Sequence, residues 1–189
     1  TKIEKKSLTC KNCIDRAKNE VIKLYSILKE DLDIEKEKIH AYFSGNEGFH
    51  IHIIDSPYNH LGSRERNELV DYIMFRGAMP ETFGMKKSQP IRSSFVDIDA
   101  KGWGGRVSKH IFGSKSKRSK AITEIISNGY SVFQQRLDNL KETIGVKIDP
   151  NVTIDIHRIF RLPGSLNSKS GLSKVRLENI DKFNPFQES

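Results

Sequence analysis

A glycine-rich turn between two short apolar runs brings groups that can bind phosphate close together. The turn Ser44–Gly48 reads SGNEG, and the run after it contains His50 and His52. Gly45 and Gly48 free the backbone, so that its amides can bind phosphate oxygens, and Ser44 adds a hydroxyl. Alternate side chains of a strand share one face, so the two imidazoles project together. The pattern predicts either a phosphate-binding hairpin or an ordinary hairpin whose polar face meets water.

A second group of reactive residues lies near the end of the chain, where acids and arginines are interleaved with strand-forming residues. Asp149 and Asp155 supply carboxylates, which can hold Mg²⁺ or Mn²⁺. Arg158 and Arg161 supply planar guanidinium groups, which stay charged and suit phosphate. The loop that follows, 167–171, offers a lysine for a triphosphate. This segment predicts either a metal- and phosphate-binding site or a salt-bridged strand at the surface.

The two cysteines of the chain, Cys10 and Cys13, have the spacing of a zinc knuckle. Zinc needs four ligands, so the pair supplies half of a structural site, and the other ligands must be histidines or lie outside this chain. Two inert thiols at the start of a helix are the alternative. So few thiols also argue against a disulfide-built secreted domain and fit a reducing interior.

Composition limits the classes of protein that can carry these residues. The chain has 189 residues, a net charge of +8 and a pI of about 9.4, which favours a polyanionic partner such as nucleic acid. The length suits one domain of ordinary size or one domain with a small appendage, and the lack of a long apolar run excludes a membrane span. Because the chain opens on Thr1 rather than Met, we expect a trimmed chain or a fragment of a longer one.

The elements that must position these residues are helices and short strands in alternation, which predicts an α+β fold. Apolar residues at helical spacing predict helices over 13–32, 64–75, 107–112, 121–126 and 131–144. Alternating residues predict strands over 39–43, 49–54, 152–156 and 172–177. Residues 84–102 lack periodicity and predict a connection.

Five stretches together resemble the small catalytic subunit of archaeal and eukaryotic DNA primases, and they occur in that family's order. The longest is VTIDIHRIFRLPGSLNSKSGL at 152–172, beside the hairpin YFSGNEGFHIHI at 42–53. LTCKNCIDRA at 8–17 resembles the second half of the family's zinc knuckle, and GWGGRV at 102–107 and DKFNPF at 181–186 are shorter matches. The resemblance implies a primase-polymerase type of α+β fold whose N-terminal part is missing.

The resemblance also implies roles for single residues. It implies two-metal nucleotidyl transfer, in which three carboxylates hold two divalent ions that activate a 3′-hydroxyl and neutralise the phosphates. The third of those acids falls at Asp149, with Asp155 as second choice. Nucleotide contacts are implied for Ser44, His50, Arg158, Arg161, Asn167 and Lys169. Of these, Lys169 belongs to a loop that closes over the nucleotide, and Asn167 replaces the usual histidine but can still donate a hydrogen bond.

The chain departs from the family pattern at several positions. The resemblance implies that the first two metal-binding acids precede the zinc knuckle, so we expect them to lie upstream of Thr1. Asp97 and Asp99 mimic that pair but follow the hairpin, and we interpret them as a look-alike. Asn46 and Glu47 stand where eukaryotic members carry arginines, and an acid repels a triphosphate unless Glu47 points away.

The resemblance therefore implies the C-terminal portion of a primase catalytic domain. It comprises a zinc-knuckle remnant (8–16), a nucleotide-binding hairpin (39–54), a variable helical region (60–145) and a catalytic segment (146–178). We expect RNA primer synthesis on single-stranded DNA from NTPs, with Mg²⁺ or Mn²⁺ and structural Zn²⁺, but not by this segment alone.

The implied partners are a large iron–sulfur subunit and a segment or chain that supplies the upstream acids. The implied location is intracellular, in the cytoplasm of an archaeon or the nucleus of a eukaryote. The alternatives are a non-catalytic nucleic-acid-binding or assembly module of the same fold, and a related repair or plasmid primase-polymerase.

Overall fold

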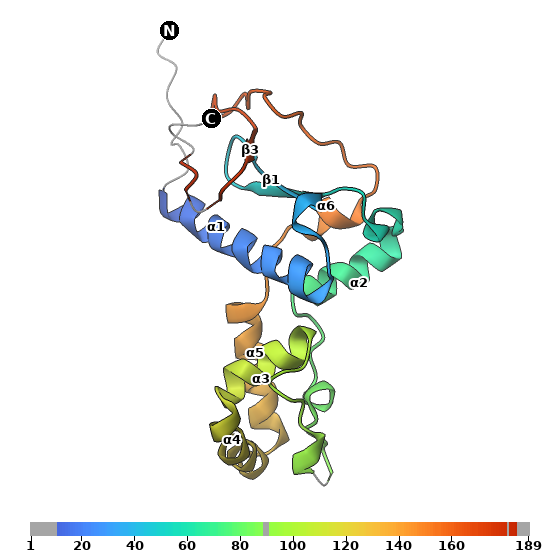
Figure 1. Cartoon of the computed structure of the whole chain (residues 1–189), viewed down its shortest axis with the longest axis vertical. Helices are drawn as coiled ribbons and strands as arrows, with labels where there is room; N and C mark the ends of the chain where they lie inside the picture. Colours follow the sequence, from blue (N-terminus) through green and yellow to red (C-terminus); the bar gives the residue numbers. More distant parts are fainter. Residues whose placement is uncertain (1–10, 89–90, 181, 185–189) are drawn as a thin grey trace. The chain divides into compact units, whose positions relative to one another are not determined.

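The computed structural model describes residues 11–88, 91–180 and 182–184, and the chain divides into two compact units (Figure 1). The first unit comprises the described residues up to Asn67 and from Ile148 onward. The second unit is Glu68–Lys147. The first unit carries the sheet and the second is built of helices, so the chain as a whole is α+β, as predicted.

A three-stranded antiparallel sheet forms the centre of the first unit. Its strands are β1 (Ile39–Phe43), β2 (Phe49–Ile53) and β3 (Val175–Leu177), in the order β2-β1-β3. The predicted hairpin is confirmed, and the Ser44 amide donates to the Gly48 carbonyl at 2.8 Å to close its turn. The last strand is shorter than predicted: Ser173 pairs only through an isolated bridge with Leu166.

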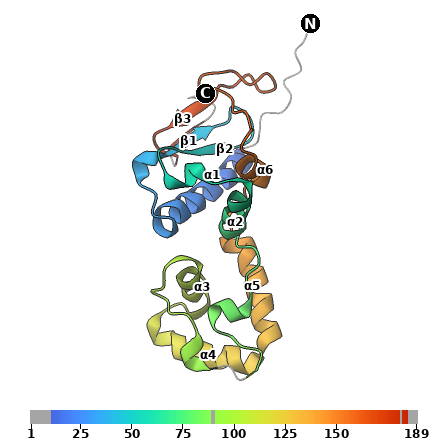
Figure 2. The same cartoon turned by 90° about the vertical axis from the view of Figure 1, so that its right-hand side faces the viewer.

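Helix α1 (Lys11–Ser26) covers the apolar face of the hairpin (Figures 1 and 2). It runs on into a π-helical turn, Ile27–Asp31, which makes one long element as predicted from 13–32. Leu28 and Ile39 are buried in a cluster with Ile51 and Ile53 of β2. Apolar burial of this kind stabilises the hairpin by about 1.5–3 kcal/mol per large side chain. The 3₁₀ turns Lys36–Lys38 and Pro57–His60 flank the hairpin in sequence.

The strand predicted over 152–156 is wrong, because the structure has a short helix there, α6 (Pro150–Ile154). The Asp149 side chain accepts from the Asn151 amide at 3.0 Å, and Pro150 occupies the first helical position. An aspartate N-cap followed by proline is a strong helix start, and it outweighs the alternation of β-branched residues after it.

The second unit contains α3 (Gly102–Phe112), α4 (Lys115–Asn128) and α5 (Tyr130–Ile144), with the unit boundary falling inside α2 (Ser63–Ile73). The predicted helices are confirmed, and α3 and α4 begin five to six residues earlier than predicted. The connection predicted over 84–102 holds only a 3₁₀ turn, Arg92–Ser94, after another at Pro80–Phe83. Buried aromatic side chains fill this unit: Phe75, Phe83, Phe95, Trp103, Phe112 and Phe133.

The repeated glycines of GWGGRV have a packing reason in this unit. A Cβ on Gly105 would lie 1.8 Å from the carbonyl oxygen of Ala100, so only glycine lets α3 approach that backbone. The indole of Trp103, on the same helix, donates to the Tyr72 carbonyl at 2.7 Å. The motif thus anchors α3 to the segments before it.

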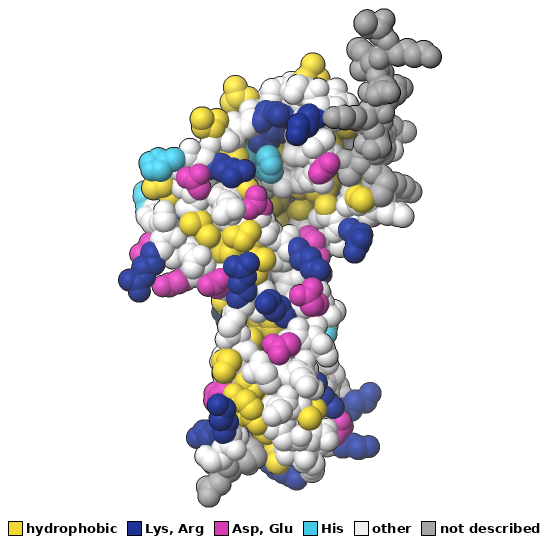
Figure 3. All heavy atoms as spheres, turned by 180° about the vertical axis from the view of Figure 1, so that it is seen from behind, with side chains coloured by type: hydrophobic (Ala, Val, Ile, Leu, Met, Phe, Trp, Pro, Cys, Tyr) yellow, Lys and Arg dark blue, Asp and Glu magenta, His cyan; other side chains and the backbone are white. Residues whose placement is uncertain are grey.

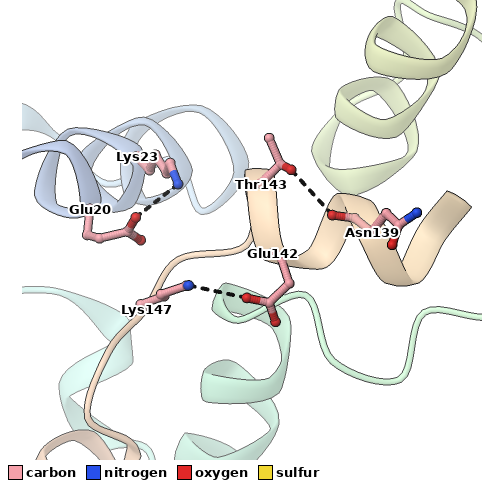
Figure 4. A network of polar contacts seen from close by, with 6 residues as sticks. All are labelled: Glu20, Lys23, Asn139, Glu142, Thr143 and Lys147. Atoms are coloured by element: carbon pink, nitrogen blue, oxygen red, sulfur yellow. Dashed lines mark hydrogen bonds and ion pairs between the residues drawn. The ribbon is translucent and has the colours of Figure 1, made fainter. Parts of the chain in front are cut away.

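Several surface charges on the helices are matched by nearby charges of opposite sign. Figure 4 shows Lys23 bound to Glu20 at 3.0 Å within α1, and separately Lys147 bound to Glu142 at 3.2 Å near the end of α5. Such exposed pairs contribute at most about 1 kcal/mol each to the stability of the fold.

None of the helices in the described ranges has the length and apolar character needed to cross a membrane.

Candidate functional site

The face of the sheet that α1 leaves uncovered carries imidazoles and a phenol. Tyr42 lies opposite His50 in the β1–β2 register, and His40 lies opposite His52. The rings of His50 and His52 have centroids 6.5 Å apart, which confirms that the two side chains share one face. The ring of Tyr42 lies 4.8 Å from that of His52. We call this group, Tyr42, His50 and His52, the polar face of the sheet.

The segment after α6 contacts this polar face. The Phe160 ring lies 5.1 Å from the His52 ring and 6.2 Å from the His50 ring. Arg158 and Arg161, on either side of Phe160, are exposed, yet both lie close enough to His50 to lower its pKa. The structure therefore places Arg158 and Arg161 near His50, and the nucleotide contacts predicted for these three residues stay predictions.

Lys174 is a member of the site that sequence reasoning missed. Its side chain is 1% exposed although it carries an ammonium group. The Nζ donates to the Arg161 carbonyl at 2.9 Å, contacts His52 Nε2 at 3.3 Å and lies 4.9 Å from the centre of the Tyr42 ring. An ammonium only donates, so His52 Nε2 must be the acceptor and its ring neutral. Lys174 thus ties the Arg161 backbone to the polar face.

The electrostatics of the site favour anions. Burial lowers the pKa of His50, and the positive charges of Lys174, Arg161 and Arg158 lower it further. Burial and then Lys174 lower the pKa of His52 to about 4. Burial also lowers the pKa of Lys174, with Arg161 adding to the effect. Every charge that shifts these three groups is positive or a titrating imidazole, so the site has a local excess of positive charge.

The turn of the hairpin meets the loop that carries Lys169. Ser44 Oγ accepts from the amides of Asn46 and Gly48, each at 3.2 Å, and so it holds the turn in shape. The hydroxyl of Ser170 donates to the carbonyl of Gly45. A Cβ on Gly45, where φ is +79°, would lie 2.8 Å from the Leu172 carbonyl oxygen, so glycine permits this close contact.

Within that loop, Asn167 is a structural residue. It is 8% exposed, and its Oδ1 accepts from the Lys169 amide at 2.9 Å. Its backbone also bonds to Leu172 and Gly171, at 2.8 Å each. Lys169 itself is exposed, in the same loop as the Ser170 contact to Gly45. The nucleotide contacts predicted for Asn167 and Lys169 stay predictions.

Both candidate metal-binding carboxylates are exposed, and each accepts a local backbone amide. Asp149 caps α6, and Asp155 Oδ1 accepts from the His157 amide at 2.9 Å. Among the residues that the structure describes, no group of three His, Cys, Asp or Glu side chains can hold a metal ion. These residues therefore do not form the three-carboxylate site by themselves, and the metal-binding role of Asp149 or Asp155 stays a prediction.

The remaining predicted ligands divide between the two units. Cys10 lies outside the described residues, and Cys13 is exposed in the first turn of α1. Asp97 and Asp99 belong to the second unit and form a turn, in which Asp97 Oδ1 accepts from the Asp99 amide at 3.2 Å and Asp99 pairs with Lys115. The strand geometry that would put both acids on one face is absent at 97–99.

A hairpin with two arginines near its polar face has the chemistry to bind phosphate, which fits the class of nucleotide-binding proteins. The family model described as DNA primase small subunit matches residues 2–178, and this chain belongs to that family. It is 62% identical over 189 residues to "DNA primase small subunit PriS" of Nitrosopumilus maritimus, covering 100% of this chain and 51% of that protein.

Two other relatives with the same name support this family assignment. The protein of Cenarchaeum symbiosum is 52% identical over 95% of this chain and 48% of its own length. That of Thermoplasma acidophilum is 34% identical over 84% of this chain and 45% of its own length. The chain thus spans about half the length of the curated relatives it matches.

Proposed function

We propose that this chain is part of the catalytic subunit of a DNA primase and that its polar face binds the triphosphate of an incoming nucleotide. In the longer protein, this site takes part in the synthesis of short RNA primers on single-stranded DNA. The relatives are named as small subunits, which supports a large-subunit partner for this chain. Because those relatives are archaeal, the proposed setting is the inside of an archaeal cell.

The observation that carries this proposal is the state of His50. Its Nδ1 is buried and has no hydrogen-bond partner among the described residues, although Lys174, Arg161 and Arg158 lie near enough to lower its pKa. A buried polar atom without a partner costs about 1–3 kcal/mol, so a ligand that supplies the partner binds with that gain. The charged groups that act on the ring are all cationic, so the ligand that they favour is an anion, such as a triphosphate.

The proposal also includes two metal sites, whose ligands the described structure does not bring together. We propose that Asp149 contributes one carboxylate to a Mg²⁺ or Mn²⁺ site, whose other acids lie outside the described residues. Carboxylate oxygens are the ligands that these ions prefer.

We also propose that Cys10 and Cys13 are two ligands of a structural Zn²⁺. Zinc analysis of the purified protein tests this directly.

Nucleotide binding tests the proposal on the full 189-residue chain. A fluorescent NTP with Mg²⁺ should bind, and Arg161→Gln should weaken binding by about ten- to a hundredfold, as expected for the removal of a charge-assisted hydrogen bond. The backbone carbonyl that Lys174 holds remains in this variant. The matched control is Arg92→Gln, an exposed arginine of the second unit. If wild type and Arg161→Gln bind the nucleotide with equal affinity, Arg161 does not belong to the binding site.

A further inference from the structure

Most of the positive charge of this protein belongs to the second unit, whereas the candidate nucleotide site belongs to the first. The second unit, Glu68–Lys147, contains 14 Lys and Arg against 8 Asp and Glu, so it carries +6 of the net charge of +8. Within it, residues 101–120 contain 7 Lys and Arg and no Asp or Glu. The rest of the unit is therefore slightly acidic, and α3 and the first half of α4 hold the whole excess.

Three of those seven cations have structural partners. Arg118 donates to the Phe95 carbonyl, Lys115 pairs with Asp99, and Arg106 lies over the Trp103 ring, 5.9 Å from its centre. The other four side chains are exposed and make no ion pair with a described residue: Lys101, Lys109, Lys117 and Lys120. We call these four the lysine patch. Figure 3 shows Lys and Arg side chains gathered at the edge of this unit where α4 lies.

The position of this charge on α4 disfavours the helix itself. Lys115, Lys117 and Arg118 lie in the first turn, which holds no acid. The N-terminal end of a helix carries partial positive charge, so each cation there is unfavourable. Packing of the unit does not require all of them, because Lys115 and Lys117 are exposed to solvent. An anion bound over this turn would offset that repulsion.

We propose that the lysine patch binds the phosphate backbone of a nucleic acid, without reading its sequence. These four exposed ammonium groups belong to a stretch, 101–120, that contains no acid, and such a stretch attracts a polyanion. The aromatic side chains of the described part of the unit are buried or half-buried, so they offer no platform for stacked bases. The choice of nucleic acid over another polyanion rests on the proposed primase function.

Charge substitution tests this assignment in the full chain. The patch variant carries Lys101→Gln, Lys109→Gln, Lys117→Gln and Lys120→Gln together. The control variant changes four exposed lysines elsewhere by the same net charge: Lys29→Gln, Lys36→Gln, Lys86→Gln and Lys141→Gln. Binding of a fluorescent oligonucleotide is measured by anisotropy at several salt concentrations, as single-stranded DNA and as duplex. Removing cations from the start of α4 should leave the thermal midpoint unchanged or higher.

The patch variant should bind at least about tenfold more weakly at about 0.1 M salt, while the control variant changes by less than about threefold. The slope of log K against log salt should become less negative by about 0.7 for each phosphate-bound lysine that is replaced on single strands, or about 0.9 on duplex. Equal weakening in both variants, or none in the patch variant, would overturn the assignment. NTP binding should be unchanged in the patch variant, which separates this test from that of the polar face.

Discussion

The proton affinity of His52 gives a prediction that comes directly from the packing of the polar face. Burial, and next the charge of Lys174, lower the pKa of His52 from 6.5 to about 4 in the folded protein. In the unfolded chain the ring takes up a proton near its ordinary pKa of about 6.5. Between these values the unfolded state binds more protons, so the free energy of unfolding falls as the pH drops from about 7 to about 4.

The size of this effect follows from the shift in pKa. A fall from 6.5 to about 4 corresponds to at most about 3 to 4 kcal/mol. The ring is only half-buried, and solvent screening reduces the figure to about 1–2 kcal/mol. Burial lowers the pKa of His50 too, and its contribution has the same sign.

Urea unfolding at neutral pH and at about pH 4, for wild type and His52→Gln, measures the contribution of this ring alone. Other titrating groups affect both proteins alike, so wild type should become less stable by about 1–2 kcal/mol more than the variant. An NMR titration of the ring protons should place the midpoint of His52 well below 6.5. A midpoint at the ordinary value, with equal acid sensitivity in both proteins, would refute the packing argument for the polar face.

Two further perturbations test the same site. Lys174→Met removes the ammonium but keeps an apolar stem, so the pKa of His52 should rise, and an NMR titration that shows no rise would contradict the 3.3 Å contact. Gly45→Ala should destabilise the protein by about 2 kcal/mol in urea unfolding, because φ is +79° and the Leu172 carbonyl is 2.8 Å away, whereas Gly48→Ala meets nothing within 4 Å and serves as the control. Equal stability of the two variants would show that the loop does not lie against the turn.

The hairpin could be predicted because its signal is local. Alternation across 39–53 and the glycines of the turn specify the register, and the structure pairs Tyr42 with His50 accordingly. The strand predicted over 152–156 failed for an equally local reason, since Asp149 and Pro150 start a helix. This cap is visible in the sequence, and it outweighs the alternation of β-branched residues that follows it.

Other features depend on contacts that a sequence does not display. Lys174 becomes buried because residues 158–161 fold back over the sheet, and a lone lysine before a strand gives no sign of this. The start of α4 was missed because its first two turns are polar, and the apolar periodicity begins only near Ile122. The basic composition predicted a polyanionic partner but not the unit that carries the excess charge.

Asp149→Asn, in a protein that also contains the other metal-binding acids proposed above, tests the central claim most directly. Asparagine caps a helix as well as aspartate does, so α6 and the thermal midpoint should be unchanged, while the carboxylate is removed. Primer synthesis on single-stranded DNA with Mg²⁺ should then fall by at least about a hundredfold, as expected when several kcal/mol of transition-state stabilisation is removed. Primer synthesis at the wild-type rate in this variant would contradict the assignment of Asp149 as a metal-binding residue.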